Sequence, residues 1–252
     1  MATTATATAT TTARRAPVDW TRKYAFATGL FYLITFAASI PAAFYFITPV
    51  LNDPNYIVSS GADTRVVIGC LLDAVNALAC VATAVAFYPV ARRLNESLAL
   101  GFVTTRIFEA AVIMAGVVSL LAVVTLRQDA GGATGADQAS LVTTGQALVA
   151  VRDYTFQFGP NISAALNALM IGTILYRSRL VPRIIPTMGL LAVLPLLAAS
   201  LATILGLTEQ GSVWFPPGGA LIFAWELSLG VYLVVKGFKP SRLTAAAAPA
   251  AA

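Results

Sequence analysis

Six long apolar stretches constrain what this chain can fold into. A bilayer core about 30 Å thick needs about 20 apolar residues from each helix that crosses it. Inside lipid the backbone must satisfy its own hydrogen bonds, and for an open chain only the helix does so. We therefore predict an all-α fold, a polytopic membrane bundle of six transmembrane helices. The expected spans are 24–48, 66–90, 97–125, 154–176, 184–207 and 216–236.

The composition excludes several other classes of protein. Hydrophobic residues make up 58% of the chain and charged residues only 11%. Soluble domains have roughly 45–50% apolar residues and about 25% charged residues. The chain has no His, which removes Ser-His and Cys-His nucleophile pairs and His-based zinc sites. Cys70 and Cys80 lie ten residues apart on one expected helix, too far for a disulfide. We expect both to be small buried side chains.

The distribution of Lys and Arg predicts how the bundle sits in the membrane. Of the 16 basic residues, twelve flank one side of the expected spans, three flank the other side and Arg106 lies inside a span. The positive-inside rule places the larger group in the cytoplasm, so both termini are expected to be cytoplasmic in a cell-membrane protein. The excess of basic residues therefore indicates membrane topology, and we expect no nucleic-acid partner. The smaller group is Arg65, Arg127 and Arg152.

The ends of the chain and its longest connection differ in composition from the spans. Residues 1–19 and 241–252 have little to bury and are expected to be disordered cytoplasmic tails, around a membrane domain at 20–240. The connection at 126–153 is expected on the outer side. Within it, 137–152 has enough apolar residues to form a short helix at the membrane or leading into it.

Four ionisable residues inside the expected spans are the strongest functional signal: Asp73, Arg106, Glu109 and Glu226. A charge at this depth costs a few kcal/mol and normally faces a partner or a wet cavity. At about 1.5 Å per residue, all four are expected near mid-membrane, within a layer about 5 Å thick. Arg106 needs an acceptor, and Glu109 and Glu226 are the candidates. Because one Arg cannot neutralise three acids, at least one acid is expected to be protonated at pH 7.

Amide side chains extend this polar layer along the second and fourth spans. The candidate mid-membrane polar site therefore comprises Asp73, Asn76, Arg106, Glu109, Asn161, Asn167 and Glu226. The alternative is a purely structural role, in which these residues only hold the helices together. We expect no metal, because Arg106 among the carboxylates opposes a cation, and the sequence indicates no cofactor.

The chain resembles the bacterial membrane-protein family catalogued as domain of unknown function 4386, over about residues 20–240. The features that carry the resemblance are Asp73, the run Arg106-Ile107-Phe108-Glu109-Ala110-Ala111, Leu175-Tyr176-Arg177-Ser178, Val181-Pro182-Arg183, Trp225-Glu226 and Lys236-Gly237-Phe238. The resemblance implies a compact helical membrane domain of about this length. It implies no activity, since the family has none assigned.

Three functions remain open. The first is a protein that binds or moves a small amphiphile or a proton at the polar site, with membrane lipids and a lipophilic small molecule as partners. The second is an intramembrane acid–base enzyme, an isomerase or cyclase acting on a lipophilic substrate. It requires a pocket of about 300–1,000 Å³ with aromatic walls, for which Phe108, Phe158, Phe223 and Trp225 are candidates. The third is an accessory or scaffold subunit with a filled core.

Overall fold

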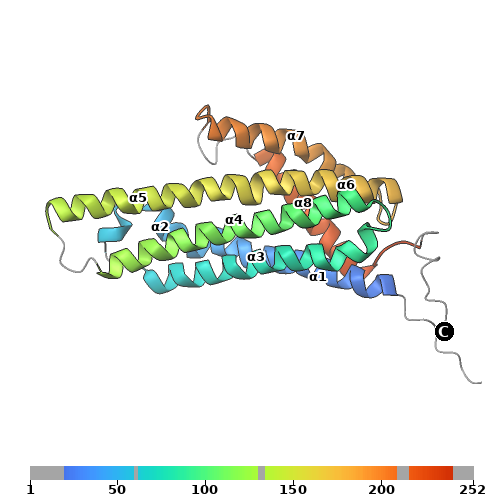
Figure 1. Cartoon of the computed structure of the whole chain (residues 1–252), viewed down its shortest axis with the longest axis horizontal. Coiled ribbons are helices and arrows are strands. Elements are labelled where there is room, and N and C mark those ends of the chain that lie inside the picture. Colours follow the sequence, from blue (N-terminus) through green and yellow to red (C-terminus); the bar gives the residue numbers. More distant parts are fainter. Residues whose placement is uncertain (1–19, 60–61, 130–133, 209–215, 241–252) are drawn as a thin grey trace, which may run out of the picture.

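The computed structural model describes residues 20–59, 62–129, 134–208 and 216–240, and every regular element in these ranges is helical (Figure 1). Six helical segments are long and apolar enough to cross a membrane, which confirms the predicted all-α, six-span bundle. The expected tails at 1–19 and 241–252 lie outside the described residues. The elements are α1 (Trp20–Pro41), the π-helix η1 (Ala42–Phe46), α2 (Thr48–Asn52), the 3-10 helix η2 (Tyr56–Val58), α3 (Asp63–Ala91), α4 (Glu96–Asp129), α5 (Ala136–Phe156), the π-helix η3 (Gln157–Ser163), α6 (Ala164–Ser178), α7 (Ile184–Ile204) and α8 (Pro216–Val235).

The fourth span is longer than predicted. The sequence suggested a span at 154–176 preceded by a separate short helix, but α5, η3 and α6 form one continuous helix of 43 residues. Pro160 lies inside η3, where a π turn accommodates a proline that lacks its backbone donor. Arg152, which was expected outside the membrane, therefore lies inside the fourth helix. Arg152 is 7% exposed, so it is buried within the helix bundle.

The six spans pack in the order in which they follow one another along the chain. α3 packs against α1 and α4, α4 against α5 and α6, and α7 against α6 and α8. The last span, α8, packs back against α1. The helices thus close a ring, and side chains that point inward from opposite sides of this ring can meet without touching lipid.

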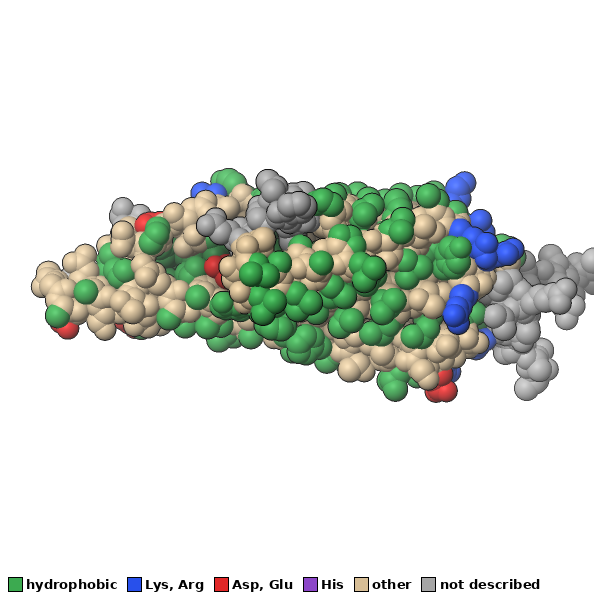
Figure 2. All heavy atoms as spheres, turned by 90° about the horizontal axis from the view of Figure 1, so that it is seen from above, with side chains coloured by type: hydrophobic (Ala, Val, Ile, Leu, Met, Phe, Trp, Pro, Cys, Tyr) green, Lys and Arg blue, Asp and Glu red, His purple; other side chains and the backbone are tan. Residues whose placement is uncertain are grey.

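Charged residues distinguish the two ends of the bundle. Figure 2 shows Lys and Arg side chains gathered at one end, which we call the basic end. Two hydrogen bonds to backbone carbonyls connect distant parts of the chain at this end. The Arg22 side chain donates to the Val234 carbonyl at 2.8 Å, and the Lys239 amide donates to the Leu180 carbonyl at 2.7 Å. At the opposite end Arg127 forms an ion pair with Asp63. This pair links the start of α3 to the end of α4.

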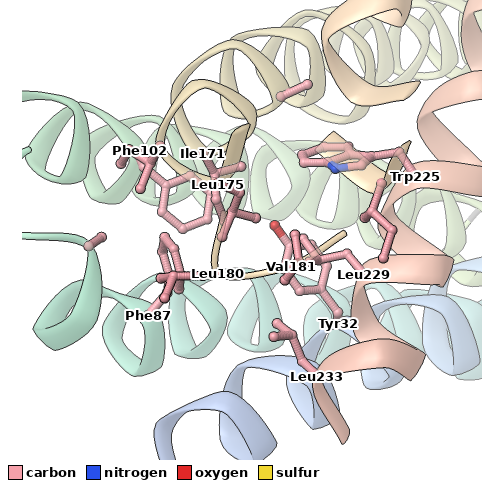
Figure 3. Packing of buried hydrophobic residues seen from close by; sticks show 14 of the residues in the cluster. Tyr32, Phe87, Phe102, Ile171, Leu175, Leu180, Val181, Trp225, Leu229 and Leu233 are labelled. Atoms are coloured by element: carbon pink, nitrogen blue, oxygen red, sulfur yellow. The ribbon is translucent and has the colours of Figure 1, made fainter. Parts of the chain in front are cut away.

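One large cluster of buried hydrophobic residues joins α1, α3, α4, α6, α7 and α8 (Figure 3). Tyr32 from α1, Phe87 from α3 and Phe102 from α4 are fully buried there, together with Trp225 from α8. The Phe87 and Phe102 rings pack edge to face, with centroids 6.0 Å apart. This core fixes the positions of α4 and α8, which carry the buried charges described below.

Two glycines let α1 and α8 approach closely. A Cβ atom added to Gly29 would lie 2.6 Å from the Gly230 carbonyl oxygen and 2.9 Å from the Val234 amide nitrogen. Both atoms belong to the backbone, so the helices themselves would have to separate. Small residues at such crossings are a recurrent means of packing membrane helices.

Gly29→Ala is therefore expected to lower the free energy of unfolding by about 1–3 kcal/mol, the usual range for overpacking a close contact. The measurement is denaturant unfolding of the purified protein in detergent. Ala37→Leu is the control, because Ala37 lies on the same helix with its side chain exposed. Equal stability of the Gly29→Ala variant and the unmodified protein would contradict the close crossing.

Candidate functional site: a polar pocket inside the ring

Buried polar side chains from three spans, among them charged residues from α4 and α8, meet near the centre of the bundle. The Arg106 guanidinium donates through Nη1 to Glu109 Oε2 and through Nη2 to Glu226 Oε1, both at 3.0 Å. The Asn167 amide donates to the same Glu109 oxygen at 2.8 Å. We call these four residues the inner cluster. The Arg106 guanidinium joins α4 to α8 by serving two carboxylates, and the hydrogen bond from Asn167 to Glu109 adds α6.

The local sequence explains the contact between Arg106 and Glu109, and the ring of helices explains the contact between Arg106 and Glu226. Arg106 and Glu109 are three residues apart on α4 and so share one face, whereas Glu226 reaches Arg106 only because α8 closes the ring. Arg106 is 2% exposed, and its guanidinium carbon lies 5.1 Å from the Tyr32 ring centroid. Within the described residues, Arg106 Nε and Asn167 Oδ1 are buried without a hydrogen-bond partner.

The remaining predicted amides lie at the margin of the inner cluster or outside it. Asn76 connects to it only weakly, because its oxygen accepts from the Cys80 thiol at 3.9 Å and Arg106 donates to the Cys80 sulfur at 3.5 Å. Asn161 instead donates to Gln157 Oε1 at 3.0 Å, within η3. Gln157 is buried and was not anticipated from the sequence.

Asp73 does not join the inner cluster and faces a different basic residue. It precedes Cys80 by seven residues on α3, which places it about 10 Å nearer the opposite end. Arg152 packs beside Gly116, seven residues beyond Glu109 on α4, so it too lies about 10 Å in that direction. We call Asp73 and Arg152 the outer pair.

The charged groups of the outer pair have no hydrogen-bonded partner among the described residues. Among the described residues, no hydrogen bond or ion pair involves the Asp73 carboxylate or the Arg152 guanidinium. The contact that Arg152 does make is with the Phe156 ring, whose centroid lies 4.9 Å from the guanidinium carbon. Two opposite charges thus lie at one level of the bundle, both without a direct hydrogen-bonded counterion.

A pocket of about 250 Å³ connects the inner cluster and the outer pair. Its charged and amide-bearing lining residues are Asp73, Asn76, Arg106, Glu109, Arg152 and Glu226. The pocket also has an apolar wall that reaches the lateral surface of the bundle, where Phe44 is 79% exposed and Phe223 is 45% exposed. The pocket is therefore polar inside and aromatic at its opening.

The aromatic walls differ from those that the sequence suggested. Of the four candidates, only Phe223 lines this pocket. Phe108 and Phe158 line a separate apolar groove between α4 and α5, and Trp225 is fully buried against Gly189. The aromatic residues that line the pocket instead are Phe36, Phe44 and Phe156. The pocket volume of about 250 Å³ lies just below the roughly 300–1,000 Å³ typical of small-molecule sites.

Sequence reasoning expected Arg152 to flank the fourth span and did not count it among the candidate site residues. The segment 137–152 was expected to be helical and contains apolar residues at 148, 149 and 151, so a buried position for Arg152 could have been considered. The pocket then holds three acids and two guanidinium groups, and no group of three or more potential metal ligands is found in the described part of the chain.

Comparison with protein families adds one finding. The family model described as "Domain of unknown function (DUF4386)" matches residues 27–237. The chain belongs to this family. Every residue of the inner cluster and the outer pair lies within the part that the DUF4386 model matches. A search of the curated proteins and a search of the solved structures gave no significant match.

Proposed function

We propose that this DUF4386 protein binds a small amphiphile in the pocket inside the helix ring. The head group of the amphiphile lies among the buried polar residues. Its apolar chain extends out of the pocket between α1 and α8 and contacts lipid. The observation that carries the proposal is the pocket itself, which touches Arg106, Glu109 and Glu226 at one end and exposed aromatic residues at the other. An amphiphile has the same two-part chemistry.

The proposal places the protein in the cell membrane with its basic end in the cytoplasm. The gathering of Lys and Arg at that end supports this orientation (Figure 2) through the positive-inside rule. The exposed Phe44 lies 24 residues from the start of α1, about 36 Å along the helix. The opening of the pocket is then in the outer half of the bilayer, and the ligand enters from the outer leaflet.

The cavity favours a binding role over a scaffold role. A subunit that used its buried charges only to fix helix packing would pair them and fill the space between them. Here the inner cluster is paired, but it borders open space, and the outer pair has no direct counterion. Burying polar groups without partners costs free energy, which a bound head group would offset.

An intramembrane acid–base enzyme is the second candidate, and Asp73 is the observation that favours it. Glu109 and Glu226 are both engaged by Arg106, whereas Asp73 faces the pocket without a hydrogen-bond partner among the described residues. A carboxylic acid beside an apolar wall is suited to proton transfer. In this variant of the proposal the amphiphile is a substrate and Asp73 is its general acid.

Blocking the opening of the pocket tests the proposal. Ser39→Trp adds a large side chain at a residue that lines the pocket, and we expect it to remove most of the lipid that copurifies with the protein. Native mass spectrometry measures the lipid bound per chain. Ala37→Trp is the matched control, because Ala37 is exposed on the same helix and does not line the pocket. Equal lipid content in the two variants would overturn the proposal.

A further inference from the structure

The outer pair combines a buried permanent charge with a free carboxylate. Arg152 is 7% exposed, and a guanidinium stays protonated in proteins. A buried charge without a hydrogen-bonded counterion is strongly unfavourable, and a contact with the Phe156 ring replaces only part of that stabilisation. Its donors are therefore available to an anionic group that enters the pocket.

The outer pair, and not the inner cluster, is where a ligand finds free partners. In the inner cluster, both Arg106 terminal nitrogens already donate to carboxylates, and Asn167 donates to Glu109. Asp73 and Arg152 line the same pocket, and the ion pairs of the described residues do not join them. A head group between them can contact both at once.

We infer that the amphiphile carries a zwitterionic head group, with its cationic group against Asp73 and its phosphate or carboxylate against Arg152; the inference rests on the proposed function. An anionic head group would satisfy Arg152 but face the Asp73 carboxylate. A cationic head group would satisfy Asp73 but leave Arg152 without an acceptor. Arg binds phosphate and carboxylate through paired donors, which makes the anionic contact directional.

The charge balance of the pocket supports the same ligand. Three carboxyl groups and two guanidinium groups line it, so with all five groups charged the pocket is net negative and an additional negative charge is disfavoured. A zwitterion adds no net charge and supplies a partner to each member of the outer pair. The aromatic residues at the opening, among them Phe36 and Phe44, then contact the start of its apolar chain.

Three single-chain probes of equal chain length test this inference on the full chain in detergent: lysophosphatidylethanolamine, lysophosphatidylglycerol and a primary alkylamine. Native mass spectrometry gives the fraction of protein bound. We expect the unmodified protein to bind the zwitterionic probe about tenfold more tightly than either of the others, the scale of one charged hydrogen bond. This comparison needs no variant and so does not depend on a variant folding.

Two substitutions assign the contacts. Asp73→Asn is expected to weaken binding of the zwitterionic and cationic probes about tenfold, since a neutral amide loses the charged contact. Binding of the anionic probe is expected to strengthen, because the carboxylate that opposes it is gone. Arg152→Gln is expected to weaken binding of the zwitterionic and anionic probes by a similar factor. Arg152→Lys, which keeps the positive charge, is expected to lose less binding. Arg65→Gln is the control, because Arg65 lies outside this pocket.

The outcomes separate the two proposals. Binding of all three probes with no preference, unchanged by Asp73→Asn and Arg152→Gln, would overturn the zwitterionic inference and leave amphiphile binding standing. Binding of no probe, or binding that Ser39→Trp does not reduce, would overturn the proposed function as well. A preference for the zwitterionic probe that is lost in Asp73→Asn and in Arg152→Gln would support the zwitterionic inference and the proposed function.

Discussion

Arg106→Met is expected to lower the free energy of unfolding by about 3–5 kcal/mol, the loss typical of removing one partner from a buried ion pair. Without the guanidinium, Glu109 and Glu226 would face each other inside the bundle with no cation between them, although each now accepts a hydrogen bond from Arg106 at 3.0 Å. Denaturant unfolding of the purified protein in detergent measures the loss.

A compensating variant shows that the loss comes from the unpaired acids. Combining Arg106→Met with Glu109→Gln and Glu226→Gln removes all three charges of the inner cluster, and replacing a buried ion pair as a whole is often nearly neutral for stability. We expect this triple variant to regain most of the stability that Arg106→Met loses. If the triple variant is no more stable than the single one, the two carboxylates are not what Arg106 stabilises.

Trp225→Ala is expected to lower the free energy of unfolding by about 3 kcal/mol or more, as large-to-small changes in packed cores do. Trp225 is fully buried, and its ring fills the space beside Gly189, where an added Cβ would lie 2.6 Å from the ring. In a membrane this packing matters directly, because van der Waals contact is a main source of helix association there. Thermal denaturation in detergent measures the effect.

Trp225→Phe is the matched control for this prediction. The indole nitrogen of Trp225 is buried and has no hydrogen-bond partner among the described residues, so its removal leaves no acceptor unsatisfied. Phe keeps most of the packing, and we expect a much smaller loss than with Ala. Equal losses in the two variants would contradict the claim that packing of the Trp225 ring stabilises α8.

The spans and part of the inner cluster were predictable from the sequence. Helix length follows from the thickness of the bilayer, so the six apolar stretches predicted six spans. Spacing placed Arg106 and Glu109 on one face of their helix, and depth made Glu226 a candidate partner. All three are now seen in contact. Whether the polar residues act as a functional site stays a prediction.

The position of the outer pair and the pocket walls were not predictable, for a physical reason. In a membrane helix both the lipid-facing and the inward-facing residues are apolar, so periodicity does not show which face is buried. Phe108 and Phe158 were therefore named as candidate pocket walls, whereas Phe36 lines the pocket and those two residues line a separate groove. Asp73 was placed by counting from a charged residue, but such residues do not mark the depth of a helix.

Mapping where an amphiphile touches the protein tests the central claim most directly. The probe is a single-chain phosphoethanolamine with a diazirine beside its head group, photolysed with the protein in lipid vesicles and located by peptide mass spectrometry. We predict labels on residues that line the pocket, around Ser39 on α1 and Phe223 on α8, lost in Ser39→Trp and kept in Ala37→Trp. Labels spread over the lipid-facing sides of all spans, and unchanged by Ser39→Trp, would contradict the account.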